Sequence, residues 1–161
     1  MVDFSRVISV RERRTATAKA REAAAFAACD AARGNLMAAH NEMEAFAESI
    51  KGLEARLLSE LMETRITVHD VNRIRDKLRQ ANERARNLVA NVRQAQAQLG
   101  MQEQSLERER EASREIQSKL RRITELDKQL TEIEAKKLVL EEDAKMDEFA
   151  DTMNRKGSPH A

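Results

Sequence analysis

The sequence predicts an all-α protein, an elongated antiparallel coiled-coil hairpin of two helices. Of its 161 residues 35% are charged and only 2% are aromatic, and much of the apolar content is alanine, which buries little surface per residue. A compact core is hard to build from such a chain. Pro159 is the only proline, so helix is permitted over almost the whole length. Apolar residues also recur at alternating steps of three and four, the heptad spacing of a coiled coil.

The first arm of the hairpin is predicted as a helix over residues 4–63. A seam of apolar residues runs along it at heptad spacing. The seam residues are Cys29, Ala32, Leu36, Ala39, Met43, Phe46, Ile50, Leu53 and Leu57. Toward the N-terminus the same register meets Arg11, Thr15 and Glu22, which are poor seam residues. We therefore expect the N-terminal part of this arm to be the less tightly packed part.

The chain is predicted to turn at residues 64–69. Ile66, Thr67 and Val68 are three consecutive β-branched residues, which lower helix propensity. Thr67 and Asp70, three residues apart, resemble a capping box at the start of the next helix. No glycine or proline enforces the turn, so two chains that pair through unbroken helices are the alternative.

The second arm is predicted as a helix over residues 70–154, followed by a disordered tail at 155–161. Its seam is regular as far as Leu99, and we expect the tightly packed half of the hairpin to lie between the turn and this level. Polar residues then occupy the seam positions Gln102, Glu109 and Ser113. Farther on, two successive steps of three predict a stammer, which overwinds the supercoil locally. These steps join Leu120, Ile123 and Leu126.

Blocks of charge support the antiparallel pairing. Residues 41–63 hold six acidic and two basic residues, whereas residues 65–93 hold eight basic and three acidic ones. A turn near Thr67 lays these blocks against each other. Residues 1–33 are net basic and residues 125–151 net acidic, and the hairpin brings them together as well. Opposite charges beside an apolar seam select the register, although each exposed pair contributes only about 0.2–1 kcal/mol.

The predicted turn also sets which residues face each other. With the fold near residue 67, the numbers of facing residues add up to about 134. Phe4 then lies near residue 130. Residues 131–154 are therefore predicted to form a helical extension without a partner helix.

The sequence contains no pattern typical of an enzyme or of a cofactor site. A two-helix hairpin has no interior to hold catalytic groups, and the four glycines stand alone rather than in a phosphate-binding loop. His40, His69 and His160 are far apart and lack further ligands at metal-binding spacing. We therefore predict no catalytic activity, no cofactor and no metal.

Net charge and cysteine content indicate the surroundings of the protein. The formal net charge of +1 gives no strong field that would attract nucleic acid or anionic lipid. No apolar stretch is long enough for a signal or membrane segment, so we expect neither nucleic-acid binding nor membrane insertion. The single cysteine, Cys29, lies among alanines, which suggests a small buried thiol in a reducing compartment. The expected location is the cytoplasm.

A run of basic residues, called the basic run below, lies near the N-terminus. It comprises Arg11, Arg13, Arg14, Lys19 and Arg21. Such a run is most often a solvated helix face. We expect it at the open end of the hairpin, facing the carboxylates of Glu132, Glu134, Glu141 and Glu142. Exposed arginines beside carboxylates suit a docking surface for a partner of mixed charge.

Short motifs stand at the N-terminus, at the turn and near the end of the second helix. The N-terminus follows the pattern Phe-x-x-Val-x-x-Val-Arg-x-Arg. The residues in this pattern are Phe4, Val7, Val10, Arg11 and Arg13. The turn segment 66–71 leads into Arg73-Ile74-Arg75, and the segment Lys145–Phe149 closes the second helix. These motifs resemble those of the FliJ/YscO-like (SctO) central stalk proteins of type III secretion systems, and the resemblance covers nearly the whole chain.

The resemblance implies a stalk similar to the γ subunit of rotary ATPases. Its paired ends would enter the pore of a hexameric secretion ATPase, and its turn would point toward the cytoplasmic domain of the export gate, peripheral to the inner-membrane secretion apparatus. The residues implied in ATPase contact are Arg11, Arg13, Arg14, Lys19, Arg21, Asp147, Glu148 and Phe149. Arg73 and Arg75 are implied in contact with the gate or another partner. The absence of tyrosine near the turn favours a virulence-type system over a flagellar one.

Two other functions stay open at this point. The chain could be an escort that binds and recycles export chaperones through the surface near Arg73 and Arg75. It could also be a generic structural coiled coil with no part in secretion. Stimulation of a secretion ATPase distinguishes the stalk from both, and binding of chaperones without the ATPase identifies the escort.

Overall fold

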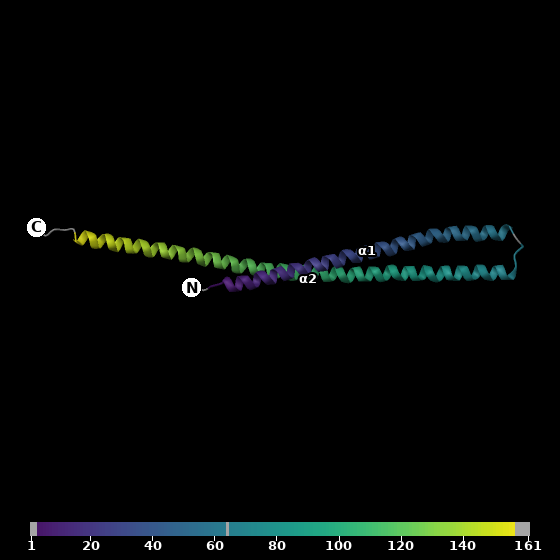
Figure 1. The fold of residues 1–161 in the computed structure, drawn as a ribbon, viewed down its shortest axis with the longest axis horizontal. Helices are drawn as coiled ribbons and strands as arrows, with labels where there is room; N and C mark the ends of the chain where they lie inside the picture. The colour runs from purple at the N-terminus through teal and green to yellow at the C-terminus, as the bar shows by residue number, and fades with distance from the viewer. Residues whose placement is uncertain (1–2, 64, 157–161) are drawn as a thin grey trace. The chain divides into compact units, whose positions relative to one another are not determined.

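Two long helices make up most of the computed structural model, which describes residues 3–63 and 65–156. Helix α1 spans Ser5–Glu63 and helix α2 spans Val68–Lys156. The helices pack against each other in antiparallel directions and are joined by a short turn (Figure 1). The protein is therefore an all-α helical hairpin, as the heptad seams and the charge blocks predicted.

Contacts between the helices divide the chain into two units. Among the described residues, unit 1 combines residues 3–18 of α1 with residues 112–156 of α2. Unit 2 is Lys19–Glu111 and contains the turn. Each helix contributes to both units, and each unit is described by itself below.

The turn is closed by a capping box at the start of α2. The Thr67 hydroxyl donates a hydrogen bond to Oδ2 of Asp70 at 2.6 Å and accepts one from the Asp70 backbone N–H at 3.3 Å. The Thr67 backbone N–H donates to the same carboxylate oxygen at 3.1 Å. Because Thr67 is the N-cap, α2 begins at Val68, two residues before the predicted start.

The two chain ends differ in how far the helices extend. Near the N-terminus, Asp3 accepts a hydrogen bond from the Ser5 backbone N–H at 2.9 Å, which caps the first turn of α1. At the other end α2 continues to Lys156, so Arg155 and Lys156, which were assigned to the disordered tail, are helical. The rest of the predicted tail, residues 157–161, lies outside the described residues, as does residue 64 in the turn.

The seam of α1 has the predicted register. From Phe4 to Leu57, every side chain that is buried or half-buried lies at a heptad position, and all others are exposed. The polar residues Arg11, Thr15 and Glu22 are part of this seam. Cys29 is 1% exposed, which confirms the expected buried thiol.

In unit 2 the packing is tightest away from the turn. Leu88, Val92 and Ala95 are buried, whereas Val71 and Leu78, nearer the turn, are 43% and 40% exposed. The predicted tight packing up to the turn is therefore wrong for this part of α2. Side-chain size does not explain the difference, since Leu78 and Leu88 are the same residue type; α1 covers the seam of α2 less completely near the turn.

In unit 1 the packing is tighter than predicted. Thr15, Ala18 and Ser113 are buried, and Ser113 is only 1% exposed. The Thr15 hydroxyl donates to the Arg11 carbonyl at 2.9 Å, and Nε2 of Gln117 donates to the Ser113 hydroxyl oxygen at 3.0 Å. These bonds satisfy the buried polar groups locally, so small polar residues close the seam instead of opening it.

The predicted stammer in α2 is wrong. Leu126 is 52% exposed, and the half-buried positions continue from Ile123 to Asp127, a step of four. The heptad spacing of α2 is therefore unbroken here. Regular supercoil geometry outweighs the gain from burying one leucine, because at this level α1 approaches its end and covers little.

Four ion pairs cross between the helices in unit 2; three fit the predicted register to within about one helical turn, and the fourth, Arg84 with Glu42, departs from it by about two turns. They are Arg33 with Glu103 at 3.8 Å, Arg110 with Glu22 at 3.9 Å, Arg73 with Glu60 at 4.0 Å and Arg84 with Glu42 at 4.0 Å. The last two join the acidic block 41–63 to the basic block 65–93. Arg84 also lies over the ring of Phe46, with its guanidinium carbon 5.3 Å from the ring centroid.

The charge blocks at the open end do not pair in the same way. In the described part of unit 1, no ion pair joins residues 3–18 to residues 112–156, and Lys119 pairs with Glu115 of its own helix. Most of the carboxylates in 125–151 lie beyond the level that α1 reaches.

Neither helix, within the residues that the structure covers, contains a stretch long and apolar enough to cross a membrane.

Candidate protein-interaction surfaces

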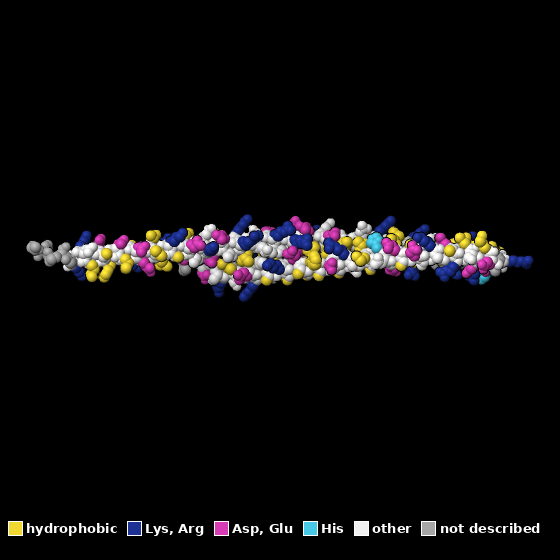
Figure 2. Space-filling view, turned by 90° about the horizontal axis from the view of Figure 1, so that it is seen from above, with side chains coloured by type: hydrophobic (Ala, Val, Ile, Leu, Met, Phe, Trp, Pro, Cys, Tyr) yellow, Lys and Arg dark blue, Asp and Glu magenta, His cyan; other side chains and the backbone are white. Residues whose placement is uncertain are grey.

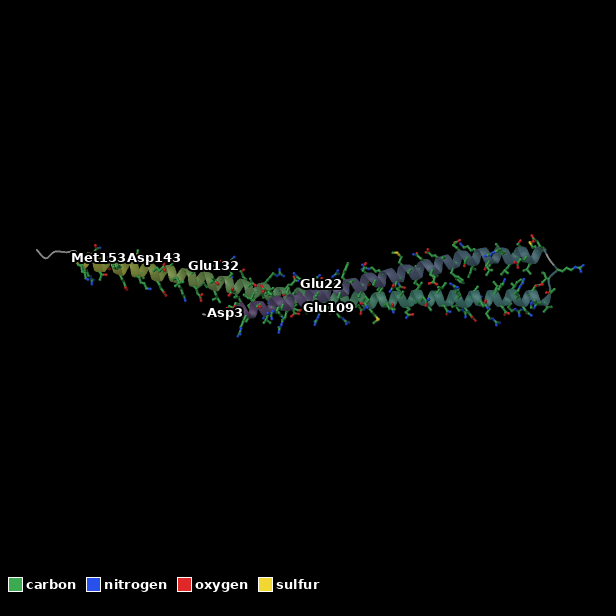
Figure 3. All side chains as sticks on the ribbon, in the orientation of Figure 1. Asp3, Glu22, Glu109, Glu132, Asp143 and Met153 are labelled. Atoms are coloured by element: carbon green, nitrogen blue, oxygen red, sulfur yellow. The ribbon has the colours of Figure 1, made fainter. Side chains whose placement is uncertain are left out.

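The C-terminal overhang, residues 135–156 of α2, is exposed at every position. Within unit 1, Asp3 lies at the level of Glu132, whereas Asp143 and Met153 lie beyond the N-terminal end of α1 (Figure 3). The predicted extension of α2 thus has no partner helix among the described residues. A predicted seam residue in this stretch, Leu140, is 67% exposed for this reason.

Large apolar side chains are exposed along the overhang, as Figure 2 shows toward the end of α2. They are Leu138, Val139, Leu140, Met146, Phe149 and Met153, each 56–71% exposed. At 100° per residue, Leu138, Phe149 and Met153 lie on one side of the helix and Leu140 lies on the opposite side. Residues 138–151 also carry six acidic residues against one basic residue, Lys145. The overhang is therefore an acidic helix with apolar side chains on two faces.

Three of the residues implied in ATPase contact, Asp147, Glu148 and Phe149, lie on this overhang. All three are exposed, and Phe149 is 65% exposed. The Glu148 and Phe149 carbonyls accept hydrogen bonds from the Thr152 hydroxyl, which leaves their side chains uninvolved. At 100° per residue, these three side chains project over about 200° of the helix circumference.

The basic run is only partly free for a partner. Arg13, Arg14, Lys19 and Arg21 are exposed, whereas Arg11 is half-buried on the seam. Arg11, Arg13 and Arg14 belong to unit 1, and the other two residues belong to unit 2. The carbonyls of Arg11 and Arg13 accept hydrogen bonds from the hydroxyls of Thr15 and Thr17, but no ion pair involves these five side chains among the described residues.

The prediction that the basic run faces Glu132, Glu134, Glu141 and Glu142 is wrong. Because Asp3 is level with Glu132, Arg13 and Arg14 lie farther along the hairpin, beside an earlier part of α2. Glu141 and Glu142 belong to the overhang and have no residue of α1 beside them. Within unit 1, the structure therefore does not bring Arg11, Arg13 and Arg14 together with Asp147, Glu148 and Phe149.

Near the turn, Arg73 and Arg75 have different surroundings. Arg73 lies 3.9 Å from Asp70 and 4.0 Å from Glu60, so it helps to join the ends of the two helices. Arg75 is exposed, and it lines a hollow on α2 with Val71, Ile74 and Leu78. Arg73 thus has a structural contact, and Arg75 is available to a partner.

Sequence reasoning missed a longer surface that continues from this hollow. A second hollow on α2 is lined by Arg86, Val89 and Arg93, and Arg86 lines both. The signal was present in the sequence, since Arg79, Arg86 and Arg93 are spaced by seven residues. It was not used because all basic residues of 65–93 were assigned to one charge block that pairs with α1.

The described residues contain no group of three or more His, Cys, Asp or Glu side chains able to hold a metal ion. His40 and His69 are exposed, and His160 lies outside the described residues. The surfaces that the helices present are apolar or charged strips on convex rods. Such surfaces define the class of protein, a helical hairpin whose chemistry is suited to contacts with other proteins.

Comparison with known families agrees with this class. The sequence model of the type III secretion protein YscO matches residues 4–152. The chain belongs to the YscO family of type III secretion proteins. No curated protein and no solved structure matches it.

Proposed function

We propose that this chain is the central stalk of a type III secretion system, which docks in the hexameric secretion ATPase, stimulates or couples its ATP hydrolysis to the export gate, and so supports protein export. Membership of the YscO family supports a role in type III secretion. The stalk would act in the cytoplasm, peripheral to the inner-membrane apparatus, and the system would be of the virulence type. It would itself carry out no catalysis.

The observation that carries the proposal is the C-terminal overhang. An isolated helix gains little stability in water, and this one leaves Leu138, Phe149 and Met153 in solvent on one face and Leu140 on the other. Full burial of one such side chain contributes about 1.5–3 kcal/mol. A flat partner can cover only one face of a helix. The overhang therefore suits a socket that encloses it, such as the central pore of a ring-shaped ATPase.

The remaining candidate residues have supporting roles in this proposal. Arg13, Arg14, Lys19 and Arg21 are exposed and would meet carboxylates of the ATPase, and Arg11 would contribute less because it is half-buried. Asp147, Glu148 and Phe149 would enter the socket with the overhang. At the turn, Arg75 and the more constrained Arg73 would contact the cytoplasmic domain of the export gate.

ATP hydrolysis by the cognate secretion ATPase, measured over a titration with the purified chain, tests the proposal. We expect stimulation at substoichiometric amounts, because one stalk serves six ATPase subunits. Replacing Met146, Phe149 and Met153 by Ser should abolish the stimulation without a change in thermal stability, since these side chains have no partner in the hairpin. The matched control replaces Met37, Leu58 and Met62, which are 64–89% exposed elsewhere, and should stimulate normally.

Charge reversal at Arg13 and Arg14 should also weaken binding to the ATPase while helix content stays constant. A chain that neither stimulates nor co-purifies with the ATPase is not a stalk. If such a chain instead binds export chaperones in the absence of the ATPase, it is the escort.

A further inference from the structure

One surface of α2 in unit 2 is only partly covered by α1 and takes no part in the proposed ATPase contact. We call it the arginine stripe. It consists of Arg75, Arg79, Arg86 and Arg93, with Val71, Leu78 and Val89 beside them. We propose that the arginine stripe is a docking site for an acidic amphipathic helix of a partner protein, which lies along α2 as a third helix.

The arginines of the stripe have no partner in the hairpin. All four are exposed, and none forms an ion pair within residues 3–63 and 65–156. Two other arginines of the same segment, Arg73 and Arg84, pair with Glu60 and Glu42 of α1. The basic residues of α2 therefore separate into one set that holds the hairpin together and another that faces solvent.

The apolar part of the stripe shows that α1 does not cover this side of α2 fully. Val71 and Leu78 are seam residues seven apart, and yet they are 43% and 40% exposed. Val89 lies beside the seam and is 39% exposed. These three side chains line two hollows that share Arg86. Another helix laid over the hollows would bury the same side chains that α1 leaves in solvent.

The spacing of the stripe indicates a helix as the occupant. Val71 and Leu78 are seven residues apart, as are Arg79, Arg86 and Arg93. A partner helix with heptad-spaced apolar residues flanked by carboxylates matches both series at once. The distance from Val71 to Arg93 is about 33 Å along α2, which corresponds to about six turns of the partner.

The charge of the segment indicates that the partner is acidic. Residues 71–93 hold seven basic residues and two acidic ones, Asp76 and Glu83, of which Glu83 lines the first hollow. Nucleic acid would satisfy the arginines, but its phosphates would gain nothing from the exposed valines and leucine between them. The mixture of an apolar floor and a basic rim therefore favours a protein helix.

A designed peptide provides the probe. It has four heptads with Leu at positions a and d and Glu at e and g, and repulsion between the glutamates opposes its self-association at neutral pH. Fluorescence anisotropy of the labelled peptide measures its binding to the full chain. The assay contains no ATPase, so its outcome is independent of the proposed stalk function.

We expect the acidic peptide to bind, and peptides with Lys at e and g, or with the same composition in scrambled order, not to bind. Reversing the charge of the stripe at Arg79, Arg86 and Arg93 to Glu should weaken binding at least about tenfold. The matched control reverses three exposed arginines farther along α2, Arg108, Arg114 and Arg121, and should change binding less than about twofold. Val89→Ser should weaken binding without lowering helix content.

Several outcomes would overturn the inference. Equal loss of binding in the two triple variants would show that net charge, and not the stripe, determines binding. If the scrambled peptide bound as well as the designed one, an amphipathic helix would not be the required ligand. A 20-base-pair duplex or vesicles of phosphatidylserine, tested in the same way, would replace the protein helix as the ligand if they bound through the stripe while the acidic peptide did not.

Discussion

A single pair of residues, Thr67 and Asp70, supports the first turn of α2. The hydrogen bond from the Thr67 hydroxyl, and after it the bond from the Thr67 backbone N–H, lowers the pKa of the Asp70 carboxyl. A carboxylate whose pKa is lowered in the folded state contributes stability above its ordinary pKa, and this contribution is lost as the pH falls through the lowered value.

We therefore expect Asp70→Asn to reduce the acid sensitivity of the hairpin. The wild-type chain should be the more stable of the two at pH 7, and the difference should disappear toward about pH 2, because Asn does not titrate. Urea unfolding followed by circular dichroism at several pH values measures it. Thr67→Val, which removes the hydroxyl donor, should shrink the same pH dependence. Identical pH dependence in wild type and Asp70→Asn would contradict the capping role.

The capping box could be predicted from the sequence because all its atoms lie within four residues. The burial of Thr15 and Ser113 could not. On a hydropathy pattern both residues weaken a seam, whereas in the structure they bond to their own helix through the Arg11 carbonyl and the Gln117 side chain. A heptad pattern ranks residues by polarity alone. It does not show that small polar side chains such as Thr15 and Ser113 can be buried under the facing helix.

Helix α2 carries two kinds of arginine that the charge blocks do not distinguish. Arg84 reaches Glu42 at 4.0 Å and Phe46 at 5.3 Å, so it contacts two residues one turn apart on α1. Arg86, two positions later, faces solvent in the arginine stripe. The angular position of each arginine around the axis of α2 decides whether it reaches α1. A charge count over a whole block contains no information on that position.

Arg84→Ala should lower the free energy of unfolding by about 1 kcal/mol. An exposed ion pair contributes about 0.2–1 kcal/mol and a cation–π contact at an exposed site about 0.5–1 kcal/mol, and the two do not add fully because they share one guanidinium. Arg86→Ala should change stability by less than about 0.5 kcal/mol. Urea unfolding of both variants gives the comparison. Equal effects would mean that the contacts of Arg84 are not formed in solution.

For helix α2, the sequence predicts the overhang correctly but not the seam register near Leu126. A turn near Thr67 makes α2 longer than α1, which leaves the end of α2 without a partner whatever the side chains are. The predicted stammer is wrong because hydropathy alone places the apolar Leu126 on the seam, whereas the structure has Asp127 at that position. The charge blocks do not reveal the exposed face of α2, because they predict that all eight basic residues of 65–93 pair with the acidic block 41–63 of α1.

For the whole molecule, the hairpin topology followed from three features that agree, namely two seams, one capping box and complementary charge blocks. The interaction surfaces could be predicted from the sequence less completely than the topology. Whether an exposed strip such as Phe149 or Arg86 binds a partner depends on a surface that is not encoded in this chain. The family relationship supplies the secretion system, and the exposed strips supply positions at which its partners can be tested.

A cross-link between the helices tests whether one chain forms the whole hairpin. Arg33 and Glu103 lie 3.8 Å apart and are about half exposed, so cysteines at these positions in a Cys29→Ala background should be joined by a short bismaleimide. The product should keep the mass of one chain, 18.3 kDa, plus the linker in mass spectrometry. Arg33→Cys combined with Glu83→Cys is the control, because Glu83 lies about 30 Å farther along α2. A cross-linked product of twice the mass at low protein concentration would instead identify two chains paired through unbroken helices.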